Sequence, residues 1–583
     1  MVRAGVFIGI DRSGQLPLLN DAAAGAGRMR DWAKTQGVSG VTNCKLITDA
    51  NGQRVSPDDV YEAIANIVNG PGVDQLIIYF AGHGVNINRG EQWLLSDAPV
   101  RTSAAIDVTG SVELARYCGI QHVVIISDAC RVAPEGIQAQ NVRGVDVFPN
   151  DGAGDRAKPV DQFLACMLGR TAAELQDPNL AAANYSALYT SALLDALSGV
   201  RPDVLDPADE PDDLALFLRM RRLERYLETE IPQRVKARGL ERRVNQNPDA
   251  IITSENGWLA RFEMPATRRG PMSPTPPGPV HTTLSRLARD LTHVAVTGGS
   301  VVTDALKPAR SATVEGSDEL AESVELLSKP FGPDRFETEC GIKVRGAHII
   351  AAFSRFASLE QVSDESLRVQ LPGVPAASTV LEVRGGFGTV IPVIQGYIAA
   401  LTFEDRQLVD ISYEPSANSW RWPMFQDYSE EVRALRAVAS SASQRGRFQL
   451  DGDDVQQIAR RMQYAKRIDP TLSVYAAYAY HDLQEIDRIR DMAGFLHNDV
   501  GCRLFDLQLL GRLLVDKAID PALFIVPFVP LLSQGWSLVR ANRVKLHPAL
   551  RGLDETMLDS LWSLYTRPGL DQLRECVSGG EVR

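Results

Sequence analysis

A histidine and a cysteine each follow a short apolar run, and these two side chains could carry chemistry together. Residues 77–81 lead into a glycine, His83 and a second glycine, and residues 123–126 lead into Ser-Asp-Ala and then Cys130. A thiolate is a nucleophile and an imidazole exchanges protons near neutral pH, so the pair is suited to nucleophilic catalysis. The simpler interpretations are a cysteine buried as a small apolar residue and a histidine that is hydrogen-bonded locally.

These two apolar runs belong to an alternation of expected strands and helices over the first 200 residues. We expect strands over 6–10, 45–48, 75–81, 122–127 and 163–168, and helices after Asp21 and over 57–69, 112–118 and 186–197. Ser56 can cap the helix that begins at Pro57. The alternation predicts a mostly parallel α/β sheet, in which the carboxyl ends of neighbouring strands meet at one edge. His83 and Cys130 are therefore expected to face each other.

The order and spacing of this pair resemble those of the caspase and metacaspase superfamily of cysteine peptidases. His83 precedes Cys130 by 47 residues, against roughly 50 in caspases, and the Ala-Cys-Arg sequence around Cys130 is also present there. The segment Asp128-Ala129-Cys130-Arg131 is similar to the cysteine motif of the bacterial caspase-like peptidases and of metacaspases.

The resemblance covers residues 2–262. Asn20-Asp21 after the first strand and residues 185–197 after the fifth match the family in order, as does the histidine between two glycines. The sequence departs from the metacaspase pattern at Arg131-Val132, where His-Ser-Gly is usual, and at Leu18, where a cysteine is usual. Neither departure falls on the histidine or the cysteine.

The resemblance implies a caspase-like fold, with a mostly parallel sheet and helices on both faces, and an endopeptidase activity. It makes Cys130 the nucleophile, His83 the acid and base, and the amides of Gly84 and Cys130 the donors to an oxyanion. Two alternatives stay open at this point. The chain could be an inactive pseudoprotease scaffold or sensor that binds protein partners, or a thiol hydrolase that does not cut peptides.

Two acidic residues are the candidate substrate-binding groups. Metacaspases place a carboxylate two positions before the cysteine, here Asp128, and another in an Asn-Asp motif after the first strand, here Asp21. Two neighbouring carboxylates repel each other and are stabilised by a bound arginine or lysine, so cleavage after basic residues is expected. The simpler interpretations are a helix N-cap for Asp21 and a turn at the strand end for Asp128.

Four regions are expected along the chain: a caspase-like domain over 1–263, a proline-rich linker over 264–283, a strand-rich domain over 284–426 and a helical domain over 427–583. In the first, a charged helix over 212–230 should precede strands near Ile251 and Trp258. The second half is predicted to be an α+β region, with strands over 344–353, 367–371, 380–384 and 390–413, that ends in helical hairpins. We expect it to bind a regulatory protein or ligand that controls the peptidase.

Composition excludes several other classes of function. The net charge of −12 argues against nucleic acid as a partner. The longest apolar run, over 522–532, is too short to span a membrane. Seven cysteines without regular spacing indicate a reducing, cytoplasmic compartment. His481, His497 and His547 have no metal-ligand spacing, so neither a metal nor another cofactor is expected; whether calcium is needed stays open.

The segment after the cysteine, over 132–159, is glycine-rich and is expected to form a long mobile loop. Members of the family often mature by cleavage there, and Arg143, Arg156 and Lys158 are candidate sites within it. Arg268-Arg269 is a further candidate site in the proline-rich linker.

Overall fold

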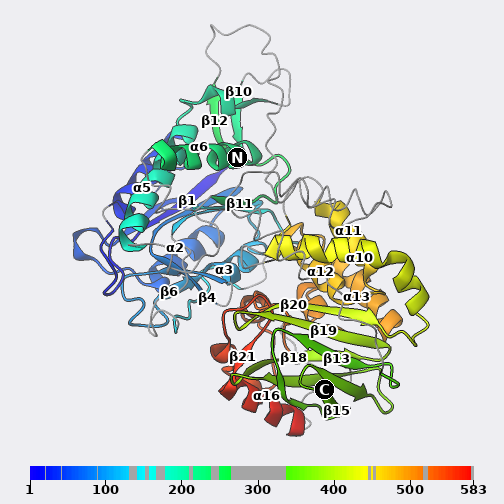
Figure 1. The fold of residues 1–583 in the computed structure, drawn as a ribbon. Helices are drawn as coiled ribbons and strands as arrows, with labels where there is room; N and C mark the ends of the chain where they lie inside the picture. Colours follow the sequence, from blue (N-terminus) through cyan, green and yellow to red (C-terminus); the bar gives the residue numbers. More distant parts are fainter. Residues whose placement is uncertain are drawn as a thin grey trace. The chain divides into compact units, whose positions relative to one another are not determined.

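The computed structural model describes residues 1–19, 21–40, 42–87, 90–129, 141–150, 156–165, 178–208, 215–237, 248–263, 336–443, 448–450, 455–515 and 523–579. The chain divides into two compact units, Met1–Val280 and His281–Arg583, drawn in Figure 1 in blue to green and in green to red. The linker predicted over 264–283 lies outside the described residues.

A six-stranded sheet forms the centre of the N-terminal unit, and its strand order is β11-β8-β7-β3-β1-β2. Neighbouring strands are parallel except for β11, which runs antiparallel to β8. The strands are β1 (Arg3–Gly9), β2 (Cys44–Thr48), β3 (Gln75–Gly82), β7 (His122–Ala129), β8 (Val160–Leu164) and β11 (Asp249–Ile251). The predicted mostly parallel α/β sheet is confirmed.

Helices cover both faces of this sheet (Figure 1). On one face α1 (Ala22–Thr35), α5 (Pro178–Leu197) and α6 (Met220–Ala237) share a hydrophobic core with alternate strand residues such as Ile77 and Tyr79. Residues between them, such as Ile78, are equally buried and point to the opposite face because side chains alternate along a strand. There α2 (Pro57–Val68) contacts β1 and β2.

Two small antiparallel sheets complete the N-terminal unit. The first has the order β4-β5-β6 and follows the central strand β3; its strands are β4 (Gly84–Ile87), β5 (Gly90–Leu94) and β6 (Ala105–Asp107). The second has the order β12-β10-β9, with β9 (Asp206–Pro207), β10 (Ala215–Arg219) and β12 (Trp258–Glu263). The first of these sheets fixes the backbone around His83.

Most N-terminal elements fall where the sequence predicts them. Ser56 forms a complete capping box with Asp59 at the start of α2, ahead of Pro57. The helix expected over 112–118 is α3 (Val108–Ala115), which begins earlier because the Asp107 side chain accepts from the Gly110 amide. The helix expected from 186 begins at Pro178, and the strand expected over 163–168 ends at Leu164.

The helix expected over 212–230 is wrong at its start. Residues Ala215–Arg219 form strand β10, and α6 begins only at Met220. The strand pairs with β12 through a register that joins Leu216 to Phe262. Pairing with a distant strand therefore overrides the local helical preference of this charged segment.

The C-terminal unit contains two sheets, with strand orders β15-β16-β13-β19-β20 and β14-β17-β18-β21. The strands are β13 (Gly341–Arg345), β14 (Ile349–Phe353), β15 (Ser358–Ser363), β16 (Ser366–Gln370), β17 (Ala376–Val383), β18 (Phe387–Ile394), β19 (Tyr397–Glu404), β20 (Gln407–Pro415) and β21 (Tyr565–Thr566). The run predicted over 344–353 is two strands in different sheets, since the chain turns at Gly346, where φ is +78°. β15 was missed because its side chains are mostly exposed.

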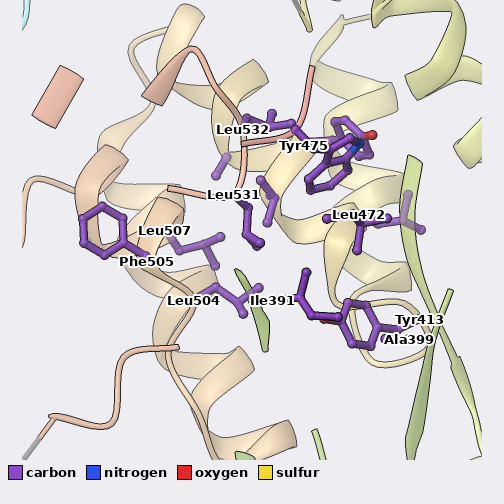
Figure 2. Packing of buried hydrophobic residues seen from close by; sticks show 14 of the residues in the cluster. Ile391, Ala399, Tyr413, Leu472, Tyr475, Leu504, Phe505, Leu507, Leu531 and Leu532 are labelled. Carbon is purple, nitrogen blue, oxygen red and sulfur yellow. The ribbon is translucent and has the colours of Figure 1, made fainter. Parts of the chain in front are cut away.

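Helices follow the strands, as predicted from residue 428 onward. They are α10 (Trp422–Ser443), α11 (Val455–Ala465), α12 (Thr471–Asp482), α13 (Ile486–Val500), α14 (Phe505–Leu510), α15 (Gly535–Ala541) and α16 (Arg567–Gly579). Figure 2 shows Tyr475 of α12 and Leu507 of α14 in one cluster with Ile391 of β18 and Tyr413 of β20. The strands and the helices of this unit therefore share a core.

A buried ionic cluster lies between β20, α10 and α12. The guanidinium of Arg436 donates to Asp469 Oδ2 (2.7 Å) and Glu414 Oε1 (3.2 Å), and Asp469 Oδ1 accepts from the Thr471 amide at 3.0 Å. Asp410, which is only 9% exposed, is in the field of the same arginine. Arg436 thus faces three carboxylates.

Within the described part of the chain, no helix is long and apolar enough to cross a membrane. The same part holds no cluster of three histidine, cysteine, aspartate or glutamate side chains with the geometry to bind a metal ion.

Candidate active site

The sheet register places His83 beside the end of β7. In the parallel pair of β3 and β7, Gly82 is opposite Ala129. His83 directly follows Gly82, and Cys130 directly follows Ala129. His83 is within the described residues, whereas Cys130 lies outside them.

The imidazole of His83 is held by a main-chain oxygen. Its Nε2 lies 2.7 Å from the carbonyl oxygen of Pro17. A carbonyl only accepts, so Nε2 carries the hydrogen and donates it, and in the neutral ring Nδ1 has the free lone pair. Burial lowers the pKa of His83 below its usual value, and the hydrogen bond to Pro17 opposes this in part. The ring is therefore mainly neutral at pH 7, with a base at Nδ1.

Both ends of this hydrogen bond are tied to the end of β5. The Leu94 amide donates to the His83 carbonyl at 2.9 Å, and the Leu94 carbonyl accepts from the Ser13 hydroxyl at 3.2 Å. Within the loop that carries Pro17, the Leu19 amide donates to the Asp11 carbonyl at 2.9 Å. The loop and the histidine are thereby fixed against one strand.

The amide of Gly84 points away from its partner strand. Gly84 pairs with Trp93, and the flanking bond from the Leu94 amide to the His83 carbonyl makes this a pair of the type that exchanges no hydrogen bonds. Because β4 is the edge of its sheet, the Gly84 N–H is directed outward, next to the histidine.

A polar and aromatic contact joins β7 to the small sheet behind the histidine. The Trp93 indole stacks on Phe80 at a centroid distance of 4.6 Å, and its Nε1 donates to Ser127 Oγ (2.9 Å) and to Glu91 Oε1 (2.8 Å). Ser127 Oγ also donates to Glu91 Oε1 at 2.5 Å. β7 is thus anchored at Ser127, two residues before its last residue, Ala129.

Asp128 is buried, with 1% of its surface exposed. Its Oδ2 accepts a hydrogen bond from the Thr190 hydroxyl on α5, and Thr190 Oγ1 lies 2.5 Å from the Tyr79 hydroxyl. Since Thr190 gives its one hydrogen to the carboxylate, Tyr79 donates to Thr190. Burial and the nearby charge of Asp128 raise the pKa of Tyr79 well above its usual value, so its hydroxyl stays protonated as this chain of bonds requires.

Asp21 precedes α1 but does not cap it through its side chain. Instead its two oxygens accept from the guanidinium of Arg28, at 2.9 Å to Nη1 and 2.6 Å to Nη2. The amide of Ala23 in the first turn donates to Asp11 Oδ1 at 3.0 Å. Asp21 is thus the N-cap residue by position, with its carbonyl accepting from the Gly25 amide at 2.7 Å, but the side-chain cap is provided by Asp11.

Gly25 of α1 brings the groups around both aspartates together. A Cβ atom on this glycine would lie 3.4 Å from the Tyr79 hydroxyl oxygen, 3.6 Å from Thr190 Cγ2 and 3.7 Å from Arg28 Nη2. The Asp128 carboxylate also contributes to raising the pKa of Arg28, although the hydrogen bond to Asp21 is the largest cause. Two acids and one arginine thus share a small region of α1 and the sheet edge.

The described part of the segment after the cysteine is docked on the small sheet. The Arg143 amide donates to the Thr102 carbonyl (2.9 Å), and the Val145 amide donates to the Ala105 carbonyl (2.9 Å). A Cβ atom on Gly144 would come within 2.5 Å of the Asp107 nitrogen, so only glycine fits there. These residues form a loop, as expected, that is hydrogen-bonded to the main chain of residues 102–107, whereas Arg156 is exposed.

Sequence reasoning missed the Pro17 carbonyl, Arg28, Tyr79 and Thr190. Arg28 follows Asp21 by seven residues, which is two helical turns, so this spacing could have revealed the pair. Thr190 reaches Asp128 only through tertiary packing, and a carbonyl leaves no signal in a sequence.

Neither a protein-family model nor a curated protein matches the chain. Among solved structures, the chain is similar to the crystal structure of protein GSU0716 from Geobacter sulfurreducens, with 14% sequence identity and a TM-score of 0.26. The match covers 43% of this chain and 92% of that one.

Proposed function

We propose that the chain is a cysteine endopeptidase of the caspase and metacaspase type, with His83 and Cys130 as its catalytic pair. The observation that supports this most is the register in which Gly82 lies opposite Ala129, since His83 and Cys130 directly follow these two residues in the sequence. The hydrogen bond from His83 Nε2 to the Pro17 carbonyl adds a second support, because it leaves Nδ1 as the base.

In the first half of the reaction, His83 Nδ1 accepts the proton of the Cys130 thiol. The thiolate sulfur attacks the carbonyl carbon of the scissile peptide bond, and a carbon–sulfur bond forms while the carbonyl oxygen becomes an oxyanion. The outward amide of Gly84, together with that of Cys130, donates to this oxyanion. The protonated imidazole then gives its proton to the departing amine as the carbon–nitrogen bond breaks.

In the second half, water attacks the resulting thioester and His83 takes its proton. The carbon–sulfur bond breaks, the sulfur leaves as the thiolate, and the proton returns to it from the imidazole. The products are a carboxylic acid and an amine, and the enzyme regains its starting state. Because the Pro17 carbonyl holds Nε2 throughout, the imidazole is kept in one tautomer and orientation.

The acidic residues favour substrates with arginine or lysine before the scissile bond. Asp128 is buried close to the end of β7, and Asp21 is paired with Arg28, whose Nη2 lies near Gly25 of α1. A basic side chain would offset the charge of these acids, whereas an aspartate would add another negative charge in a region of low dielectric. Peptides with basic residues are therefore the proposed substrate class.

We propose that the protein acts in the cytoplasm. Its C-terminal unit is proposed to regulate the peptidase activity by binding a protein or ligand. Its architecture differs from the N-terminal unit, with two sheets and a set of helices around a core of their own. By analogy with the domains attached to bacterial caspase-like peptidases, the proposed role is in regulated cell death or defence.

The test compares peptide cleavage by the wild type with that of Cys130→Ala and His83→Ala. Each substitution is expected to lower kcat/KM by at least about 1,000-fold, since the two residues act as a unit. Cys44→Ala and His348→Ala remove the same residue types outside the proposed site and are the matched controls. More than a tenth of the activity left in Cys130→Ala would refute the assignment.

An acyloxymethyl ketone with arginine next to the reactive group should label wild-type Cys130 alone. Of the cysteines in the described part of the chain, four are buried and only Cys44 is partly exposed, with its pKa raised by burial. A chain that folds but neither reacts nor cuts peptides would be a binding scaffold. Turnover of esters without turnover of peptides would make it a thiol hydrolase of another kind.

A further inference from the structure

The Arg28 guanidinium binds the Asp21 carboxylate in the way that the arginine of a substrate would. It makes two parallel hydrogen bonds to the carboxylate, at 2.9 and 2.6 Å, which is the bidentate geometry that guanidinium and carboxylate groups prefer. A Cβ atom on Gly25 would lie within 3.7 Å of Arg28 Nη2 and also of the Tyr79 and Thr190 groups that lead to Asp128. One of the two candidate substrate-binding acids is therefore already engaged.

The rest of α1 does not require this ion pair. Asp11 and the backbone satisfy the start of the helix, and the helix is anchored in the core through Ala26, Met29 and Trp32. The Arg28 side chain is 45% exposed and that of Asp21 is 30% exposed. An arginine in this position can exchange its partner for water without disturbing packed residues.

We propose that Arg28 is an internal competitor for the substrate's basic side chain, and that this residue sets the threshold for substrate binding. The inference rests on the proposed function, because it takes Asp21 as a substrate-binding residue. A substrate arginine must displace the Arg28 guanidinium from Asp21, and Arg28 turns to solvent when the substrate binds. The carboxylate is already oriented for a planar guanidinium, so arginine binds better than lysine, whose ammonium group is a point charge.

The competition predicts the direction in which substitutions act. With Arg28→Gln the Asp21 carboxylate no longer has a bound guanidinium, so an arginine ligand should bind about 2- to 5-fold more tightly, the upper part of the range for a partly exposed ion pair with bidentate geometry. Arg28→Lys keeps the charge and loses the bidentate geometry, so its gain should be smaller. If Arg28 instead held Asp21 in place for the substrate, both substitutions would weaken binding.

The experiment measures binding rather than cleavage, in the full chain carrying Cys130→Ala. N-acetyl-arginine amide and N-acetyl-lysine amide are titrated calorimetrically into this protein and into versions that also carry Arg28→Gln or Arg28→Lys. Arg30→Gln is the matched control, because Arg30 lies on the same helix and pairs with Asp31 at 2.7 Å. Adding Asp21→Asn to the Arg28→Gln protein should abolish the gain.

Tighter arginine binding in Arg28→Gln, absent in Arg30→Gln and lost with Asp21→Asn, supports the proposal. Unchanged or weaker binding in Arg28→Gln overturns it, and so does the absence of arginine binding in every version. Peptide cleavage by the wild-type chain is assayed separately. A chain that cuts peptides but fails the binding test keeps its proposed function and loses only the competitor.

Discussion

Asp410 of β20 should make the C-terminal unit less stable as pH rises through neutrality. Burial raises the pKa of this carboxyl group from 3.8 to about 7, and the nearby charge of Arg436 offsets the effect only in part. That arginine is already paired with Asp469 and Glu414. The ionised form of Asp410 is therefore poorly compensated in the folded protein.

The magnitude follows from the difference between the two states. A group whose folded-state pKa is raised contributes its full stability below the unfolded-state pKa and loses it as pH rises through the folded-state pKa. For Asp410 this loss runs from about pH 4 to about pH 8 and amounts to about 4 kcal/mol in the free energy of unfolding; relaxation around the charge brings the expected value to about 2–4 kcal/mol. Asp410→Asn keeps the shape of the neutral form and should remove this contribution to the pH dependence.

The assay is hydrogen exchange of peptides from β20 and α10 in the full chain, corrected for the intrinsic effect of pH. At pH 8 the exchange-derived free energy of unfolding should be higher in Asp410→Asn than in the wild type by about 2–4 kcal/mol. Near pH 4 the two proteins should have the same value. Asp405→Asn, at an exposed position in the turn between β19 and β20, is the matched control. If Asp410→Asn were less stable than the wild type at pH 8, Arg436 would be compensating the charge and the reasoning would be refuted.

Two further predictions concern the N-terminal unit. Asp128→Asn should raise KM for peptides with arginine before the scissile bond by at least about 10-fold, with little change in melting temperature because the amide oxygen still accepts from Thr190; an unchanged KM would remove Asp128 from substrate binding. Self-cleavage should occur after the exposed Arg156 and not after Arg143, whose amide is hydrogen-bonded to the Thr102 carbonyl; sequencing of new N-termini in the wild type and in Cys130→Ala tests this. Cleavage after Arg143 would mean that the docked segment opens readily.

The sequence was sufficient where local interactions determine the structure. The capping box of Ser56 and Asp59 and the apolar spacing of α2 use contacts within one helix, so a single segment carries the information. The buried strands β3 and β7 were recognisable for a similar reason, because continuous apolar runs have few alternatives in an α/β chain. The register that sets Gly82 opposite Ala129, each directly before His83 and Cys130 in the sequence, is consistent with that pattern.

The sequence was insufficient where contacts between distant segments of the chain determine the local structure. Residues 215–219 look helical alone, and only the pairing with β12 makes them a strand. Asp21 has the position and type of an N-cap residue. Nevertheless, the Asp11 side chain accepts the hydrogen bond from the first turn of α1, and the Asp21 carboxylate pairs with Arg28. Each outcome depends on competition between partners that meet only in the folded chain.

The carbonyl that holds His83 belongs to the main chain, and every amino acid has one. The ring of Pro17 is exposed, so the identity of the residue at this position can drift during evolution as long as the loop keeps its path. A sequence alignment would then show no conserved residue at this position, although its main-chain carbonyl fixes the tautomer of the histidine. Anyone grafting this histidine and cysteine onto another scaffold would have to transfer the curvature of residues 11–19 as well, because the shape of the loop is what supplies the oxygen.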